Sequence, residues 1–150
     1  KELGKDIRLQ LSIEHNFYTS KHYYLMSILR NLVMNSIDAI PQSKKGGKII
    51  IEQWLKEDAY YFKISDNGSG IEEDELKDIF SPGFSTKINY DTGEINRGLG
   101  LSIVQYIVEE QLKGTLTVSS ALGMGTKFEI NIPREILEEK NNEDLYSWRW

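Results

Sequence analysis

The chain has 150 residues, 39% of them hydrophobic, a size and apolar fraction that suit one globular domain with a single core. Its net charge of −5 offers no basic field to hold nucleic acid or an anionic membrane surface, so any bound phosphate must be gripped locally. The absence of cysteine excludes disulfides and thiolate metal sites, and two histidines argue against structural zinc. No apolar stretch is long enough for a membrane span, and we expect no signal peptide at the start of the chain.

The first half of the chain predicts three strands and one helix. Asp6 to Glu14 alternates between apolar and polar residues, which predicts a half-buried strand. Tyr23 to Ile40 has helical periodicity and stops before Pro41. Lys48 to Leu55 and Tyr60 to Ser65 are β-like runs joined by a short polar stretch, which predicts an antiparallel hairpin.

The second half predicts two helices and a second pair of strands. Glu72 to Phe80 is a short acidic helix, and Ser81 to Arg97 shows neither helical nor strand periodicity, which in a small domain indicates a functional loop. Leu99 to Leu112 is an amphipathic helix with Gly114 at the position of a C-cap glycine. Two further β-like runs follow, at Thr115 to Ser120 and Thr126 to Ile132.

These elements predict an α+β two-layer sandwich, in which a mixed, mostly antiparallel sheet of about five strands carries three helices on one face. We expect one domain over residues 1–133. The tail, residues 134–150, is charged, ends in Trp148 and Trp150, and fits neither a core helix nor a plain linker, so it stays unassigned. Because the first residue is Lys1, we expect a fragment of a longer protein.

A polar stripe on the first helix is the first candidate site. Asn31, Asn35 and Asp38 fall at i, i+4 and i+7 and therefore share one face. Asparagine is a poor interior helix residue, and its amide oxygen is a hard ligand that suits Mg²⁺. A solvated polar face explains the stripe equally well.

A glycine-rich turn after a strand is the second candidate. In Asp66-Asn67-Gly68-Ser69-Gly70, alternate glycines allow the backbone to approach a ligand closely, and a carboxylate at a strand end can accept a hydrogen bond from an exocyclic amine such as that of adenine. Taken alone, a plain surface turn is the stronger explanation.

The third candidate opens the second long helix. Gly98, Leu99, Gly100 and Leu101 place free backbone amides at a helix N-terminus, which favours an anion, although simple capping explains them too. No strand directly precedes this turn and the spacing is not GxGxxG, so a Rossmann site is excluded, and the P-loop pattern is absent.

The loop between these clusters has the composition of a lid. It carries two aromatics, glycine hinges and cations: Phe80, Gly83, Phe84, Ser85, Thr86, Lys87, Gly93 and Arg97. Lys87 or Arg97 can meet phosphate oxygens when such a lid closes over a nucleotide. A surface loop whose aromatics pack on the core is the alternative.

In this order, the clusters resemble the boxes of the GHKL ATPase superfamily, and most closely those of sensor histidine kinases. NLVMNSIDAI (Asn31 to Ile40) is similar to the N box, DNGSGI (Asp66 to Ile71) to the G1 box, IFSPGFSTK (Ile79 to Lys87) to the F box and RGLGLSIV (Arg97 to Val104) to the G2 box. GMGTKFEINIP (Gly123 to Pro133) resembles the closing glycine-threonine segment. The match covers Asp6 to Pro133.

The resemblance implies a Bergerat fold that binds ATP or ADP with Mg²⁺. By this resemblance Asp66 reads the adenine amine with help from Thr126, Asn35 holds Mg²⁺, and Asn31 supports the metal and phosphates. The remaining implied contacts line the adenine pocket or meet the phosphates: Gly68, Gly70, Ile71, Phe84, Lys87, Arg97, Gly98, Leu99, Gly100 and Leu101. Many histidine kinases have a basic residue at the position of Asp38, so we assign Asp38 no catalytic role.

Asn31 separates classes within the superfamily. The gyrase, Hsp90 and MutL relatives resemble one another in carrying a glutamate there as general base, and an amide cannot take that proton. Phosphoryl transfer needs mainly positioning and charge neutralisation, so the resemblance implies a kinase. GFSTK followed by RGLGL also resembles the citrate and dicarboxylate sensor branch.

The resemblance also implies the partners. The phosphoacceptor histidine belongs to a helical dimerisation domain absent from this chain, and a response regulator acts downstream. His15 and His22 fit surface or structural positions. We expect a monomeric fragment that is cytoplasmic and touches neither nucleic acid nor membrane; whether the parent is membrane-anchored stays open. The alternatives are an anti-sigma-factor serine kinase of the same fold and a non-catalytic, nucleotide-responsive interaction module.

Overall fold

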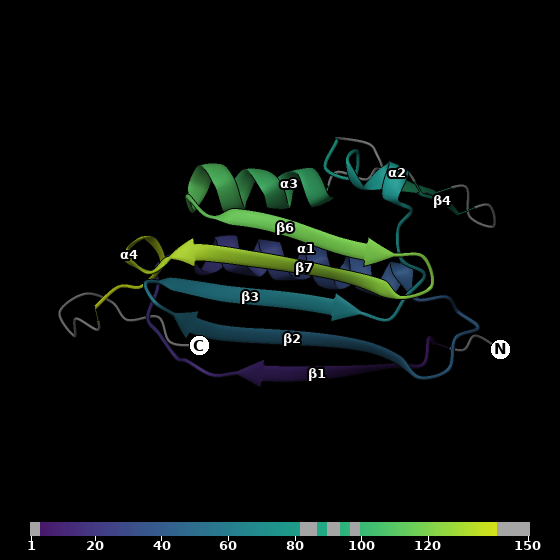
Figure 1. Ribbon diagram of the computed structural model, residues 1–150, viewed down its shortest axis with the longest axis horizontal. Helices are drawn as coiled ribbons and strands as arrows, with labels where there is room; N and C mark the ends of the chain where they lie inside the picture. The colour runs from purple at the N-terminus through teal and green to yellow at the C-terminus, as the bar shows by residue number, and fades with distance from the viewer. Residues whose placement is uncertain (1–3, 82–86, 90–93, 97–99, 141–150) are drawn as a thin grey trace.

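The computed structural model describes residues 4–81, 87–89, 94–96 and 100–140. Its main feature is a five-stranded sheet in the order β1-β2-β3-β7-β6 (Figure 1). The strands are β1 (Ile7–Ile13), β2 (Gly47–Lys56), β3 (Ala59–Asp66), β6 (Thr115–Ala121) and β7 (Gly125–Pro133). β1 pairs with β2 in parallel and the other three pairings are antiparallel, which confirms the predicted mixed, mostly antiparallel sheet.

The long helices cover one face of the sheet. α1 (His22–Ala39) lies behind the strands in Figure 1, and α3 (Gly100–Tyr106) packs beside it. α3 continues without a break into a π-helix, η1 (Ile107–Gln111). The helix predicted at Leu99 to Leu112 therefore forms, with a wider last turn. The predicted sandwich of helices on one face of a sheet is therefore confirmed.

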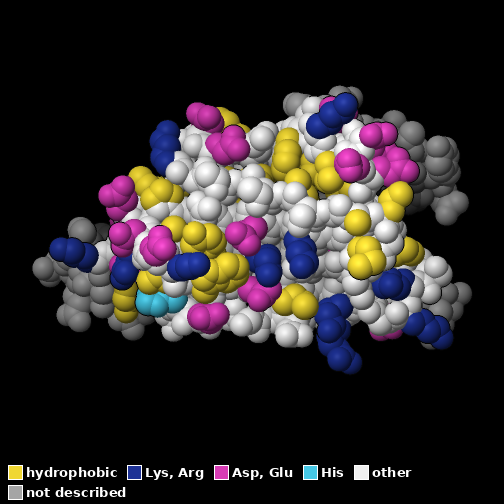
Figure 2. All heavy atoms as spheres, viewed as in Figure 1, with side chains coloured by type: hydrophobic (Ala, Val, Ile, Leu, Met, Phe, Trp, Pro, Cys, Tyr) yellow, Lys and Arg dark blue, Asp and Glu magenta, His cyan; other side chains and the backbone are white. Residues whose placement is uncertain are grey.

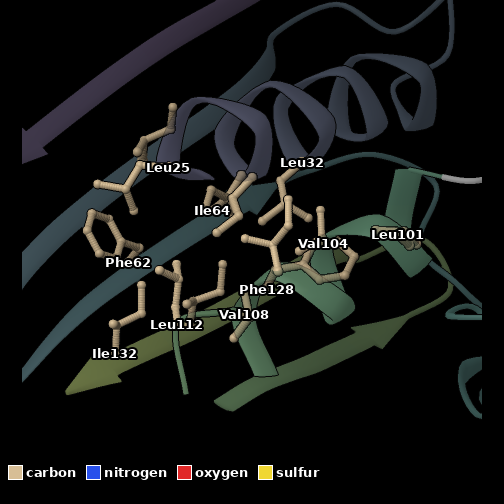
Figure 3. Packing of buried hydrophobic residues seen from close by; sticks show 14 of the residues in the cluster. Leu25, Leu32, Phe62, Ile64, Leu101, Val104, Val108, Leu112, Phe128 and Ile132 are labelled. Atoms are coloured by element: carbon tan, nitrogen blue, oxygen red, sulfur yellow. The ribbon is translucent and has the colours of Figure 1, made fainter. Parts of the chain in front are cut away.

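The core fills the space between this helical layer and the sheet. In Figure 3 side chains from α1, β3, β7 and the α3–η1 segment point toward one another, among them Leu32, Ile64, Val104 and Phe128. All four are essentially inaccessible to solvent. Within each element the buried residues follow its period: every second residue in the strands and every third or fourth in the helices. This is why the sequence could predict the elements.

The prediction that β1 is half-buried is wrong. Leu9, Leu11 and Ile13 are 54%, 62% and 56% exposed, although they alternate with polar residues as expected. The alternation correctly indicates a strand, but burial depends on a covering layer. In Figure 1 none of the helices in the described part of the chain lies behind β1, which forms the edge of the sheet.

The short elements also differ from the prediction. The acidic helix is only α2 (Glu73–Leu76) and not Glu72 to Phe80. The stretch predicted to lack periodicity contains a small antiparallel hairpin, β4 (Lys87–Asn89) with β5 (Glu94–Asn96). Strands of three residues are too short to show a period of two.

Two features, one after β7 and one after η1, extend the prediction or differ from it. The unassigned tail begins with a short helix, α4 (Arg134–Leu137), whose Leu137 is fully buried. Lys113, and not Gly114, takes the left-handed conformation after η1, with φ 56°. Gly114 is required for a different reason, because a Cβ there would lie 2.1 Å from the carbonyl oxygen of Asn131.

The opposite face of the sheet is open to solvent. Figure 2 shows this face with basic and acidic side chains intermixed around a hydrophobic cluster. On β2 and β3, Trp54 and Tyr61 stack with ring centroids 5.3 Å apart, and Lys63 pairs with Glu52 at 3.5 Å. An antiparallel sheet with one solvated face is stable in this arrangement because each strand alternates inward and outward residues.

Candidate functional site

Asp66 is the last residue of β3 and lies at the centre of the candidate site. The ladder places it beside Ile49 of β2 and Thr126 of β7, and its side chain is buried, with 7% of the residue exposed. Its Oδ1 accepts a hydrogen bond of 2.9 Å from the Gly68 amide. Its Oδ2 is buried and, among the residues that the structure describes, has no hydrogen-bond partner. A buried carboxylate oxygen without a donor is costly, and a ligand that brings a donor would relieve that cost.

Burial raises the pKa of the Asp66 carboxyl above its ordinary value. The Gly68 amide, the Ser36 hydroxyl and the Thr126 amide each oppose that rise. Neither Ser36 Oγ nor Asp66 Oδ2 forms a hydrogen bond within the described part of the chain. The site is thus a desolvated carboxylate that is only partly satisfied by its own fold.

A hydroxyl network holds the strand ends next to Asp66. Thr126 is buried, and its Oγ1 lies 2.8 Å from Ser120 Oγ on the neighbouring strand β6. Ser120 Oγ also donates to the Gly125 carbonyl and accepts from the Ile71 amide, both at 2.8 Å. The network therefore ties β6, β7 and the turn after β3 together beside the carboxylate.

The glycines of the turn after β3 are required by close backbone approaches. A Cβ on Gly68 would lie 2.5 Å from the carbonyl oxygen of Ala39 at the end of α1. Gly70 has φ +78°, and a Cβ there would lie 2.0 Å from the carbonyl oxygen of Ala121. The Ser69 amide donates to that same Ala39 carbonyl at 2.9 Å. The turn is consequently clamped between α1 and the β6–β7 hairpin, and is no free surface turn.

Asn31, the first residue of the polar stripe on α1, meets the start of α3. Asn31 is half-buried, and its Nδ2 donates to the Ser27 carbonyl oxygen at 2.7 Å. A Cβ built on Gly100 would lie 2.7 Å from Asn31 Oδ1, so the N-terminus of α3 meets this side chain directly. Asn35, one turn along α1, is also half-buried, whereas Asp38 is exposed. Two clusters separated by about seventy residues in sequence thus meet in space.

Several predicted site residues are not tested. Phe84, Arg97, Gly98 and Leu99 lie outside the described residues, and for Lys87 only its place in β4 is described. Leu101 is buried in the core on α3, next to Gly100. The structure therefore brings together Asn31, Gly100 and, around Asp66, the residues Gly68, Gly70, Ile71 and Thr126.

The two histidines have structural surroundings, as expected. The His15 ring lies 5.7 Å from the ring of the buried Tyr60, and its amide donates to Gln53 Oε1 at 3.0 Å. The His22 ring lies 4.3 Å from that of Tyr23 at the start of α1. Within the described ranges, no group of three or more histidine, aspartate or glutamate side chains could hold a metal ion.

Two supporting residues, Ser36 and Ser120, were missed in the sequence, and a third, Asn67, was named in the glycine-rich turn without a role. Ser36 occupies a buried position of α1 in series with Leu25, Ile28 and Leu32, and a lone hydroxyl in an apolar stripe was a usable signal. Asn67 accepts from the Lys48 amide at 2.7 Å and donates to the Gly46 carbonyl at 3.0 Å, which fixes the turn to the start of β2. Ser120 had no distinguishing signal, because its role depends on strand register.

The fold is that of nucleotide-binding histidine kinase catalytic domains. The catalytic domain of histidine kinase ThkA superposes with a TM-score of 0.67 at 26% identity, covering 86% of this chain and 80% of that one. Full-length ShkA, solved in complex with AMPPNP, shares the fold with a TM-score of 0.70 at 20% identity, over 89% of this chain and 26% of that one.

Residues 21–136 match the family model described as histidine kinase-, DNA gyrase B-, and HSP90-like ATPase. The chain belongs to this family, as its resemblance implied. A probable C4-dicarboxylate sensor kinase of Halalkalibacterium halodurans is 34% identical over 140 residues, 88% of this chain and 25% of that protein. Sporulation kinase E of Bacillus subtilis is 34% identical over 122 residues, 80% of this chain and 15% of that protein.

The chain spans about a quarter or less of the length of these curated relatives. It corresponds to their ATPase domain, which supports nucleotide use. In the described ranges, no helix has the length and apolar character needed to cross a bilayer.

Proposed function

We propose that this chain is the ATP-binding catalytic domain of a sensor histidine kinase, and that it donates the γ-phosphoryl of ATP to a histidine on a dimerisation domain outside the chain. In that reaction the bond between the γ-phosphorus and the bridging oxygen breaks, ADP leaves, and a phosphorus–nitrogen bond forms with the imidazole. The observation that carries the proposal is the buried carboxylate of Asp66, whose Oδ2 lacks a donor among the described residues.

Asp66 would read the adenine base. Its free oxygen can accept a hydrogen bond from the exocyclic amine of adenine, and guanine has a carbonyl oxygen at the corresponding ring position, which would repel the carboxylate. Thr126 lies beside Asp66 across the β3–β7 ladder and would assist through its hydroxyl. Gly68 and Gly70 would let the turn that carries the base site pack closely against Ala39 and Ala121, since a Cβ on either would strike a backbone carbonyl.

Asn35 would hold Mg²⁺ together with the phosphates of the nucleotide. An amide oxygen is a hard ligand, and Mg²⁺ in phosphate sites commonly takes one or two protein ligands and completes its shell with phosphate oxygens and water. This choice fits the lack of an acidic metal cluster in the described ranges. Mg²⁺ would neutralise charge on the triphosphate, while Asn31, Lys87, Arg97 and the α3 N-terminus from Gly98 to Leu101 would hold the phosphates in place.

Asn31 favours a kinase over a hydrolase. Its Nδ2 is bound to the Ser27 carbonyl and its Oδ1 faces Gly100, so the side chain is a fixed dipole next to the start of α3. An amide cannot accept a proton from water at neutral pH, and activated water is what hydrolysis requires. Phosphoryl transfer to an imidazole needs no general base on this chain, because positioning and charge neutralisation supply most of the rate.

The names of the curated relatives support the rest of the assignment. Sensor kinases recur among them, and one is a probable C4-dicarboxylate sensor kinase. We propose that a response regulator receives the phosphoryl group downstream and that the domain works in the cytoplasm as a monomer tethered to its dimerisation domain.

Nucleotide titration of an Asp66→Asn variant tests the proposal. We expect affinity for ATP to fall about 10- to 100-fold, because the amide cannot offer the same charged acceptor. Asp58→Asn is the matched control, since it removes the same charge just before the other end of β3, and it should bind ATP like the parent chain. Calorimetric titration with ATP and GTP measures both, and equal affinities in the two variants would remove the adenine assignment.

Transfer is tested with the full-length protein and γ-labelled ATP with Mg²⁺. The expected product is an acid-labile, base-stable phosphohistidine. An acid-stable phosphoserine on a partner would favour the anti-sigma-factor kinase instead, and nucleotide binding with no transfer would favour the interaction module.

In Asn35→Ala, the gain in ATP affinity that Mg²⁺ provides over EDTA should largely disappear.

A further inference from the structure

Strand β1 presents an apolar face that nothing in the described structure covers. Leu9 and Leu11 pair with Ile49 and Ile51 of β2, so all four side chains lie on the helical side of the sheet. Ile49 and Ile51 are 1% and 8% exposed beneath α1, whereas Leu9, Leu11 and Ile13 are more than half exposed. Coverage by the helical layer therefore stops at β2. Another strand can pair with the free backbone groups of an apolar edge strand of this kind.

A groove continues this face at the Ile13 end of β1. Its volume is about 410 Å³, and it lies between α1 and the connection that follows β1. Apolar side chains form most of its walls, among them Ile13, Phe17, Met26 and Leu29. An apolar hollow next to an apolar edge strand offers room for large aromatic side chains.

The C-terminal tail leaves the described structure beside this groove. The Glu139 amide donates to the Tyr18 carbonyl oxygen at 2.7 Å, in an isolated antiparallel bridge between the two residues. Tyr18 itself lines the groove. The Glu139 carboxylate also accepts a hydrogen bond from the Ser20 amide. The tail thus starts antiparallel to the connection that follows β1, and it starts at the groove.

The sequence of the tail has the pattern of a strand. Tyr146, Trp148 and Trp150 alternate with Ser147 and Arg149, which places the three aromatic residues on one face of an extended chain. The candidate nucleotide site does not include these aromatic residues and so does not explain the pattern. Short aromatic alternations are typical of strands that cover an apolar surface.

The register of the Tyr18–Glu139 bridge brings the two apolar faces together. Carried on without a slip, it puts Tyr146 opposite Leu11 and Trp148 opposite Leu9. Tyr146 lies seven positions after Glu139, and Tyr18 lies seven positions after Leu11, so both stretches span up to about 23 Å when extended. A slip of two residues would keep the same side chains on the same face, because side chains in a strand alternate with a period of two.

We propose that residues 144–150 add to the free edge of β1 of the same chain as an antiparallel strand, with Tyr146, Trp148 and Trp150 covering Leu9, Leu11 and the groove. The tail would close the edge of the sheet, so that any other chain that pairs with β1 must first displace it. This inference does not depend on nucleotide binding.

Hydrogen exchange of the full 150-residue chain tests the proposal. The β1 amides that point away from β2 should exchange at least about 10-fold more slowly than in an open edge strand. The matched variant exchanges two neighbours, Ser147→Trp with Trp148→Ser, which keeps the composition and moves one tryptophan to the opposite face. We expect this variant to lose the protection of β1, while the amides of β3 and β7 stay protected and show that the domain is folded.

Three results would overturn the proposal. In the first, the outward amides of β1 in the parent chain exchange hydrogen as fast as those of an open edge strand. In the second, the variant with Ser147→Trp and Trp148→Ser keeps full protection of β1. Protection that appears only with dimer formation in light scattering at rising protein concentration would assign the face to a second copy. ATP affinity unchanged by the exchange of Ser147 and Trp148 is expected, which separates this inference from the proposed function.

Discussion

At the scale of single residues, burial of Asp66 makes stability depend on pH in the direction opposite to that of a salt-bridged aspartate. Its folded-state pKa is raised by burial above the value of about 3.9 for an unfolded chain. Between the two values the folded state binds more protons than the unfolded state, so the free energy of unfolding falls as pH rises through this window.

Asp66→Asn should remove that dependence. Relative to the parent chain, the variant should gain stability as pH rises from about 3 toward neutrality, because it has no carboxylate to ionise in the buried site. Urea unfolding at a series of pH values measures this difference. If the variant instead loses stability relative to the parent chain as pH rises, the Asp66 carboxylate is well solvated or paired in the folded protein.

At the scale of elements, the turn after β3 should tolerate no side chain at Gly70. Gly70→Ala combines φ +78° with a Cβ 2.0 Å from the Ala121 carbonyl oxygen, and we expect a loss of at least about 3 kcal/mol in the free energy of unfolding. Gly46→Ala is the matched control, because Gly46 has φ +75° but open space around it, and should cost about 1 kcal/mol. Equal losses in urea unfolding would mean that the turn can move away from β6.

The helix α4 is anchored by a buried hydroxyl. Tyr60 is fully buried on β3 and its hydroxyl donates to Glu138, which also accepts from Arg134 Nε at 3.1 Å. Tyr60→Phe keeps the ring and should cost about 1–2 kcal/mol. Thermal unfolding measures the expected drop, roughly 2–6 °C for a domain of this size. Tyr61→Phe, on the open face, should change the midpoint little, and a similar drop there would contradict the assigned anchor.

At the scale of the whole molecule, local periodicity carried the prediction of the fold. The alternation in β2, β3 and β7 and the helical stripe of α1 depend on each element's own residues, so they could be read before the structure was known. The exposure of Leu11 could not, because it depends on how far α1 reaches across the sheet. The β4–β5 hairpin was missed because each strand has only three residues.

In the candidate site, too, the features encoded by local sequence could be predicted, and those that depend on packing could not. Asp66 and Asn31 could be named from the sequence because the order of four short motifs is specific. The contact of Asn31 with Gly100 and the place of Ser120 beside Thr126 depend on packing and register, which no single motif encodes. The sequence therefore indicates the proposed ligand contacts more readily than the residues that hold them in place.

Amide chemical-shift mapping during titration with ATP and Mg²⁺ tests the central claim most directly. We predict saturable shifts that cluster at Asp66 to Ile71, at Asn31 and Asn35 on α1, and at Gly100 and Leu101 on α3, with little change at the turn between β2 and β3. Titration with no saturable shifts, or with shifts centred on the open face around Trp54 and Tyr61, would contradict the account.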